Sequence, residues 1–158
     1  MLPFVDKKFV VKSPGALVNN GSLTCNVIDT QGFRLCRIVL HLGATDIALT
    51  ALKIQESDVK ASATALTGGA DITGTVFGTD KNDAGTTSVL PSATDDDKYF
   101  TFEIDLRGRK RYLLPVVTIG NGSVGAYTAI TAELWRAENT PVKAADKGVS
   151  QNMRLPVL

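Results

Sequence analysis

Apolar and polar residues alternate along several stretches of the chain, a period typical of β-strands with one buried face. The clearest stretch is 99–106, where one set of side chains would face a core and the other solvent. The inward set is Phe100, Phe102, Ile104 and Leu106, and the outward set is Tyr99, Thr101, Glu103 and Asp105. No window longer than two helical turns has apolar residues at helical spacing. We therefore predict an all-β chain.

Two alternating stretches, 22–27 and 36–42, flank the sequence DTQG at 29–32, whose Asp and Gly are typical of a turn. This arrangement predicts a β-hairpin over 22–42. Leu23 and Val27 would share the buried face of the first strand with a cysteine.

The register of this hairpin decides where its two cysteines lie. A two-residue loop would place Cys25 opposite Cys36, whereas a bulge at Gly32 would place Arg37 there instead. A disulfide closing the loop would stabilise the fold by about 3 kcal/mol in the chain-entropy model. We favour two buried, reduced thiols that act as small hydrophobic side chains.

Further strands are predicted at 49–56, 112–119 and 126–136, and the last two would follow 99–106 in a three-stranded meander. Between them, 57–92 is rich in Gly, Ala, Thr and Ser, which indicates a long irregular segment with one or two weak strands. Short strands at this spacing favour a two-layer antiparallel β-sandwich, jelly-roll-like or a related barrel.

The 158 residues are expected to form a single β domain. Its core would span about 18–137, with an N-terminal arm at 1–17 and a C-terminal arm at 138–158. The predicted core residues are Cys36, Ile38, Leu40, Leu52, Ile54, Phe100, Phe102, Ile104, Val117, Ile119, Ile130 and Leu134.

Composition limits the possible functions. Hydrophobic residues make up 44% and charged residues 21%, and a formal net charge of +1 gives no overall attraction to nucleic acid or to an anionic membrane. No stretch is apolar enough for a membrane span or for a signal peptide. The single histidine, His41, lies in an apolar alternation and can build neither an imidazole metal site nor a hydrolytic triad. We expect no enzymatic activity, no cofactor and no metal.

The strongest charged feature is the basic segment RGRKR at 107–111. Gly108 would allow a tight turn there. Three interpretations compete: a hairpin tip kept soluble by its cations, a nucleic-acid contact, and a docking surface for an acidic partner. The near-neutral chain and the single neighbouring aromatic residue, Tyr112, speak against nucleic acid. We favour protein docking as the functional interpretation, with the soluble tip as its alternative.

Several runs carry a resemblance to a known class. LTALKIQESDVK, then LPSATDDDKYFTFEIDLRGRKRYLLPVVTIGNG and AITAELWRAENTPV, resemble small virion structural proteins of tailed bacteriophages. The chain looks most like a capsid decoration, or cement, protein. The resemblance covers roughly residues 49 to 142, and DLRGRKRYL is its most distinctive part.

This resemblance implies a non-enzymatic protein that binds the outside of a phage capsid and stabilises the shell. Its partners would be the major capsid protein and other copies of itself, in a homotrimer, without a membrane and without direct contact to nucleic acid. It would be made in the cytoplasm of the bacterial host and located on the capsid surface of the virion. Contacts are expected from the basic segment and the apolar chain ends, at Arg107, Arg109, Lys110, Arg111, Leu2, Phe4, Arg154, Leu155 and Leu158.

Two alternatives remain open at this point. The chain could be another virion component, such as a tail or adaptor protein that forms rings. It could instead be a carbohydrate-binding β-sandwich, for which Trp135, Tyr127 and Tyr99 would be the stacking platforms.

Overall fold

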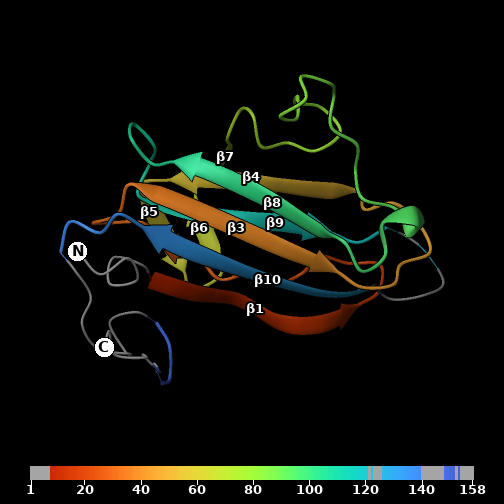
Figure 1. Ribbon diagram of the computed structural model, residues 1–158, viewed down its shortest axis with the longest axis horizontal. Helices are drawn as coiled ribbons and strands as arrows, with labels where there is room; N and C mark the ends of the chain where they lie inside the picture. The colour runs from red at the N-terminus through yellow and green to blue at the C-terminus, as the bar shows by residue number, and fades with distance from the viewer. Residues whose placement is uncertain (1–7, 121, 123–125, 140–147, 152, 154–158) are drawn as a thin grey trace, which may run out of the picture.

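Two four-stranded antiparallel sheets lie face to face in the structure, a computed structural model (Figure 1). It describes residues 8–120, 122, 126–139, 148–151 and 153, with side chains outside 11–17 and 126–127. The first sheet has the order β1 (Lys8–Val18), β10 (Ala126–Trp135), β3 (Leu35–Leu42) and β8 (Tyr99–Asp105). The second has the order β2 (Ile28–Asp29), β9 (Tyr112–Thr118), β4 (Ala51–Ser57) and β7 (Ala70–Asp71). The predicted antiparallel β-sandwich is confirmed.

The strand order is that of a jelly roll. In the first sheet, β10 lies between β1 and β3, and β3 lies between β10 and β8. In the second sheet, β9 lies between β2 and β4. One further hairpin is inserted between these eight strands. Successive strands of the sandwich therefore change sheets, except from β4 to β7, as in the double Greek key of this architecture. The inserted hairpin, β5 (Val59–Ser62) with β6 (Ala65–Thr67), lies between β4 and β7. A single 3-10 turn, η1 (Ala93–Asp95), precedes β8.

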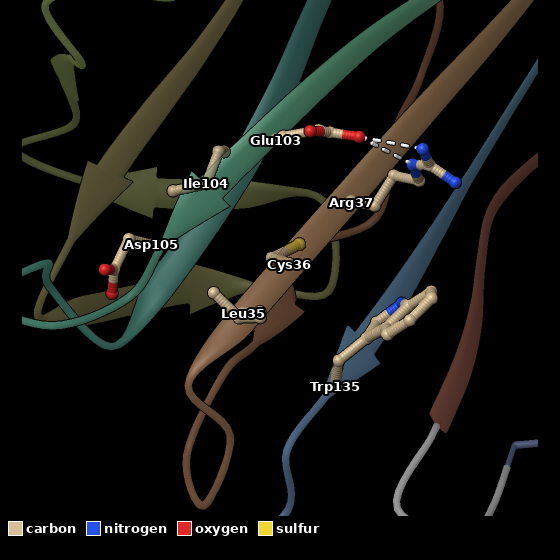
Figure 2. A pocket seen from close by; sticks show the side chains of 7 residues that line it. All are labelled: Leu35, Cys36, Arg37, Glu103, Ile104, Asp105 and Trp135. Carbon is tan, nitrogen blue, oxygen red and sulfur yellow. Dashed lines mark hydrogen bonds and ion pairs between the residues drawn. The ribbon is translucent and has the colours of Figure 1, made fainter. Parts of the chain in front are cut away.

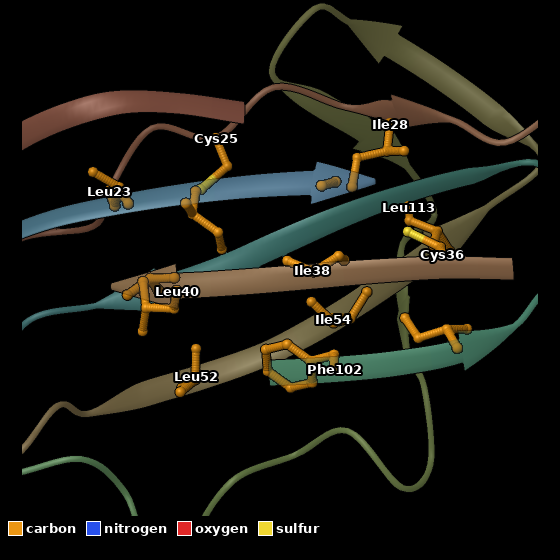
Figure 3. Packing of buried hydrophobic residues seen from close by; sticks show 14 of the residues in the cluster. Leu23, Cys25, Ile28, Cys36, Ile38, Leu40, Leu52, Ile54, Phe102 and Leu113 are labelled. Atoms are coloured by element: carbon orange, nitrogen blue, oxygen red, sulfur yellow. The ribbon is translucent and has the colours of Figure 1, made fainter. Parts of the chain in front are cut away.

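The core lies between the two sheets and follows the alternation of each strand. Figure 3 shows side chains of β3, β4 and β8 meeting in this space. Every predicted core residue is buried except Phe100, which is half-buried and packs against the cluster. The other members of the cluster are Leu23, Cys25, Ile28, Leu42, Leu49, Ile72, Leu106, Leu113 and Ala132. The predicted inward and outward sets of 99–106 are likewise confirmed, since Phe102, Ile104 and Leu106 are buried.

The predicted hairpin over 22–42 is wrong, although its turn is right. Phe33 donates its N–H to the Thr30 carbonyl, and Gly32 has a φ of +82°. This turn joins the two sheets, because β2 pairs with β9 whereas β3 pairs with β10 and β8. Cys25 and Cys36 are therefore not cross-strand neighbours, and both side chains are buried thiols.

The predicted three-stranded meander is wrong for the same reason. β8 pairs with β3, β9 pairs with β4 and β2, and β10 returns to the first sheet beside β3. The basic segment is consequently a connection between sheets and not the tip of a hairpin. Alternation identifies the buried face of each strand, but it does not determine which strand lies beside it.

Pro115 explains why β2 has only two residues. The backbone N–H and C=O groups of the odd-numbered residues of β9, and of Ile119 directly after it, point toward the segment that precedes β3. Ile119 donates its N–H to the Gly21 carbonyl, and Leu23 donates its N–H to the Val117 carbonyl. Pro115 has no N–H to offer on that side. The register changes there, and Val27 donates instead to the Ala63 carbonyl in the inserted hairpin.

The N-terminal arm was predicted too long, and only part of the predicted C-terminal arm is described. Residues 8–17, expected in the N-terminal arm, belong to β1 at the edge of the first sheet. Within 138–158, the described residues form no strand, and a Cβ at Gly148 would lie 1.9 Å from the Phe9 carbonyl oxygen, so the chain approaches β1 there. The described part of the chain has no helix long and apolar enough to cross a membrane.

Candidate functional site

The basic segment is held by carboxylates from distant parts of the chain. Arg109 forms an ion pair with Glu56 at 3.5 Å, and the Lys110 amide donates to the same carboxylate at 3.1 Å. Arg107 binds Asp105 through both its backbone amide and its guanidinium. This arrangement lowers the pKa of Asp105 to about 2, mainly through the hydrogen bond from the Arg107 side chain.

Arg111 is held by a carboxylate from a distant strand. Its Nε donates to Asp29 Oδ1 at 2.9 Å and its Nη2 to Asp29 Oδ2 at 2.7 Å, a two-pronged contact across 82 positions of sequence. The hydrogen bond from Arg111 lowers the pKa of Asp29. The Arg111 guanidinium also lies 4.9 Å from the ring centre of Tyr112.

These pairs change the electrical character of the basic segment. Three of its four cations are neutralised within the chain, while among the described residues the Lys110 ammonium forms no ion pair. The contact role of Arg107, Arg109, Lys110 and Arg111 stays a prediction. The other predicted contact residues lie outside the described residues: Leu2, Phe4, Arg154, Leu155 and Leu158.

The outer face of the first sheet carries several apolar and aromatic side chains. Phe9 is 42% exposed and Tyr99 67% exposed, and the His41 ring stacks on Tyr99 at 4.7 Å. Val39 is half-buried at the centre of this face, between Thr131 of β10 and Thr101 of β8. One cross-strand row is charged, because Arg37 binds Glu103 at 2.7 Å.

A mostly apolar hollow of about 400 Å³, the Trp135 hollow, lies at one end of this face (Figure 2). Trp135 and Leu35 supply its apolar wall, and Trp135 Nε1 donates to Glu133 Oε2 at 3.0 Å. Arg37 donates to Glu103 Oε1 from both Nε and Nη2, and among the described residues Oε2 of that carboxylate accepts no hydrogen bond. Of the three predicted stacking platforms, Trp135 lines this hollow, Tyr99 lies at the other end of the face, and the Tyr127 side chain lies outside the described residues.

A second hollow, the β8 groove, has a volume of about 510 Å³. Consecutive residues of β8, 99 to 103, form one side, and the 74–88 segment forms the other. Phe77, from that segment, meets Phe100 and Phe102 edge-on, with ring centres 5.9 Å and 5.5 Å apart. Elsewhere, no three His, Cys, Asp or Glu side chains among the described residues lie close enough together to hold a metal ion.

Comparisons with known proteins leave the function to be argued from these surfaces. No known protein family and no curated protein matches the chain. Among solved structures, the crystal structure of the SPBc2 prophage-derived protein YomS aligns with a TM-score of 0.41 and 15% sequence identity. That alignment covers 83% of this chain and 94% of the other. A similarity at this level carries no argument about function.

Neither the two hollows nor the distant carboxylates around the basic segment were predicted from the sequence. Asp29, Glu56 and Asp58 are all far from 107–111 in sequence, and only the sandwich brings them there. One signal was available for the Trp135 hollow: the chain has a single tryptophan, and it lies at the end of an alternating strand.

Proposed function

We propose that this protein is a non-enzymatic structural component of a tailed-phage virion that binds the outside of the assembled capsid and stabilises the shell. Its partners in this role are the major capsid protein and further copies of itself. The sequence resemblance of 49–142 to decoration proteins supports the proposal, and so does the jelly-roll fold, which recurs in viral capsid proteins.

The observation that carries the proposal is the outer face of the first sheet. A sheet face covered only by solvent is expected to be polar, whereas this one presents Phe9, Val39 and the stacked His41 and Tyr99 rings. Aromatic side chains and arginine are enriched in protein interfaces, and Arg37 lies on this face beside these apolar groups. Many copies of one modest contact, repeated over a shell, give high avidity.

Sedimentation with undecorated capsids tests the proposal. The wild-type protein is expected to sediment with the shells until the sites are saturated, and to remain a small oligomer in their absence. Rings or tubes formed by the protein alone, without binding to shells, would instead identify a tail or adaptor component and would overturn the proposal.

A pair of matched variants locates the contact. Val39→Glu places a charge at the centre of the proposed face, and we expect it to weaken shell binding at least tenfold. Val116→Glu places the same charge on β9, on the outer face of the second sheet, and should bind as the wild type does. Equal binding by both variants would exclude this face as the contact.

A second candidate function has a specific observation in its favour. The Trp135 hollow combines an indole ring with the Arg37–Glu103 pair, and one carboxylate oxygen of that pair is still available. Pyranose rings stack their C–H faces on indole, and their hydroxyls bind carboxylate and guanidinium groups. Lectins also use the jelly roll. A neutral saccharide would suit this local balance of charges.

Fluorescence tests this alternative directly, because Trp135 is the single tryptophan of the chain. Titration with neutral mono- and oligosaccharides should change its emission if the hollow binds them, and Glu103→Gln should weaken the response. A silent glycan array, together with unchanged emission, would remove the saccharide function.

A further inference from the structure

The free edge of β8 is the strongest unassigned feature of the molecule. β8 is the last strand of its sheet, and the 72–92 segment lies on the side away from β3 (Figure 1). Leu42 donates to the Lys98 carbonyl and Leu106 donates to the Arg34 carbonyl, so the even-numbered residues direct their backbone toward β3. The odd-numbered residues must therefore direct theirs toward the opposite edge.

Those outward backbone groups lack partners within the described structure. Among the described residues, the N–H and C=O groups of Thr101 and Glu103 make no hydrogen bond. An exposed sheet edge of this kind is a template for the addition of another strand. The β8 groove runs along this edge, because its lining includes five consecutive residues and hence both faces of the strand.

The opposite wall of the groove is already rigid. The Asp80 carboxylate accepts hydrogen bonds from the Gly74 and Val76 amides, each at 2.8 Å. Ser88 donates its hydroxyl to the Asp80 carbonyl at 2.7 Å. A preformed wall lowers the entropic cost of binding.

The side chains around the groove define what would fit. Phe77, Phe100 and Phe102 form an aromatic cluster at one side. The charged groups of the lining are three carboxylates, from Asp80, Asp83 and Glu103, and one ammonium, from Lys81; Glu103 is paired with Arg37, so the lining keeps a small negative excess. An occupant would therefore need an apolar residue on one face and a cation on the other.

We propose that the free edge of β8 binds an extended segment of a partner protein, which adds as a fifth strand and carries alternating apolar and basic residues. Backbone hydrogen bonds would supply affinity, and the aromatic cluster and the carboxylates would supply specificity, as in other cases of strand addition. Five residues of β8 span about 14 Å, enough for a strand of four or five residues. The proposal rests on the proposed function only in taking the partner to be a subunit of the shell.

The first test needs no capsid. The probe is a capped peptide, Lys-Val-Lys-Val-Lys-Val, titrated into isotope-labelled protein while the backbone amides are followed by NMR. We expect the Thr101 and Glu103 amides to shift with a Kd below the millimolar range. The Glu-Val counterpart should bind at least tenfold more weakly. Unchanged Thr101 and Glu103 amides at millimolar Lys-Val peptide would overturn the proposal.

Two variants of one residue separate backbone from side-chain effects. Thr101→Pro removes the N–H that faces the free edge, where proline is tolerated in a strand, and should abolish peptide binding. Thr101→Val keeps this N–H and should bind the peptide as the wild type does. Circular dichroism and thermal unfolding confirm that each variant is folded. Undiminished binding by a folded Thr101→Pro protein would overturn the proposal.

Sedimentation of the same variants with undecorated capsids separates this inference from the proposed function. If the wild-type protein does not bind the capsids but binds the peptide, the proposed function is wrong and strand addition is still supported. If the wild-type protein binds shells but not the peptide, strand addition fails alone. Loss of both activities in Thr101→Pro, with both retained in Thr101→Val, supports the whole proposal.

Discussion

Arg111 and Asp29 join the basic segment to the strand β2 through two parallel hydrogen bonds of 2.9 Å and 2.7 Å. The neighbouring residue strengthens this joint, because Thr30 donates both its N–H and its hydroxyl to the Arg111 carbonyl. Asp29, the last residue of β2, and Thr30, which follows it, therefore hold the side chain and the backbone of Arg111. Arg111, which is predicted to contact a partner, is also part of the connection between two strands.

Asp29→Asn should loosen this joint. The amide keeps an oxygen for the Gln31 N–H but loses the charge that binds Arg111. Because both side chains are partly exposed, the free energy of unfolding should fall by no more than about 1 kcal/mol. Hydrogen exchange at the Thr30 amide should accelerate, and this change is the sharper measurement.

Glu103→Gln is the matched control for this change. It breaks another Arg–carboxylate pair, with Arg37 on the first sheet, whose carboxylate is more exposed. The loss of stability should be similar, but exchange at Thr30 should not change. Faster Thr30 exchange in both variants would mean that the joint at Arg111 has no local role.

Acid should weaken the fold through its paired carboxylates. The pKa values of Asp29, Asp71, Asp95 and Asp105 are all lowered from the ordinary value of 3.8, that of Asp105 to about 2. A carboxyl with a lowered pKa in the folded state stabilises that state above its unfolded pKa, and the contribution is lost as the pH falls. The urea concentration at the midpoint of unfolding should therefore stay constant while the pH is above the ordinary pKa of these carboxyls. It should decline as the pH falls from about 3.8 toward 2. A decline that is complete above pH 4 would contradict this assignment.

Most of the long strands of the sandwich could be found from the sequence, but β1, which was expected to be part of an arm, and the partners of most strands could not. The stretch 99–106 shows why: its alternation gives the buried set Phe102, Ile104 and Leu106 without saying that β3 lies beside it. The turns at Gly32 and Gly108 were also located correctly, and both have positive φ. Either turn could have closed a hairpin or joined two sheets, since a local sequence does not determine the long-range pairing that follows it.

The candidate sites were less predictable than the strands, because they depend on that pairing. The basic segment looks like an unpaired cluster of cations when only 107–111 and its neighbours are considered. Its carboxylate partners at positions 29 and 56 become neighbours only after β2 and β4 pair with β9. The free edge of β8 likewise exists only because no strand follows it in the sheet order.

Both cysteines should remain reduced and unreactive in the native protein. Cys25 is 3% exposed and Cys36 is 2% exposed (Figure 3). Cys36 lies on β3 in the first sheet, whereas Cys25 lies in the segment that leads into β2 of the second sheet. Mass spectrometry without reductant should show two thiols, and alkylation should require unfolding. Rapid labelling of either thiol in native buffer would contradict the burial described here. A mass lower by two hydrogens would reveal a disulfide.

Gly120→Ala should destabilise the fold by steric conflict. A Cβ at this position would lie 2.3 Å from the Ala48 carbonyl oxygen and 2.8 Å from Ile47, so backbone would have to move. Overpacking of this kind costs about 1–3 kcal/mol. Gly69→Ala is the control, because its Cβ would meet the mobile end of Gln55 at 3.3 Å. For Gly120→Ala, the urea concentration at the midpoint of unfolding should be well below that of the wild type and of the control. Equal midpoints for the two variants would be incompatible with the close approach at Gly120.

Thr128→Val should stabilise the protein, because the Thr128 hydroxyl is a buried polar group that no described residue hydrogen-bonds. Thr128 is 0% exposed on β10, and among the described residues its Oγ1 makes no hydrogen bond. Such a group costs about 1–3 kcal/mol, and valine replaces the hydroxyl with a methyl of similar size. We expect the free energy of unfolding to rise by about 1 kcal/mol in urea. Thr128→Ser keeps the hydroxyl but removes a buried methyl, and should lower stability by about 1 kcal/mol. A valine variant less stable than the wild type would mean that the hydroxyl is bonded in solution, and the inner face of β10 would then need a polar partner.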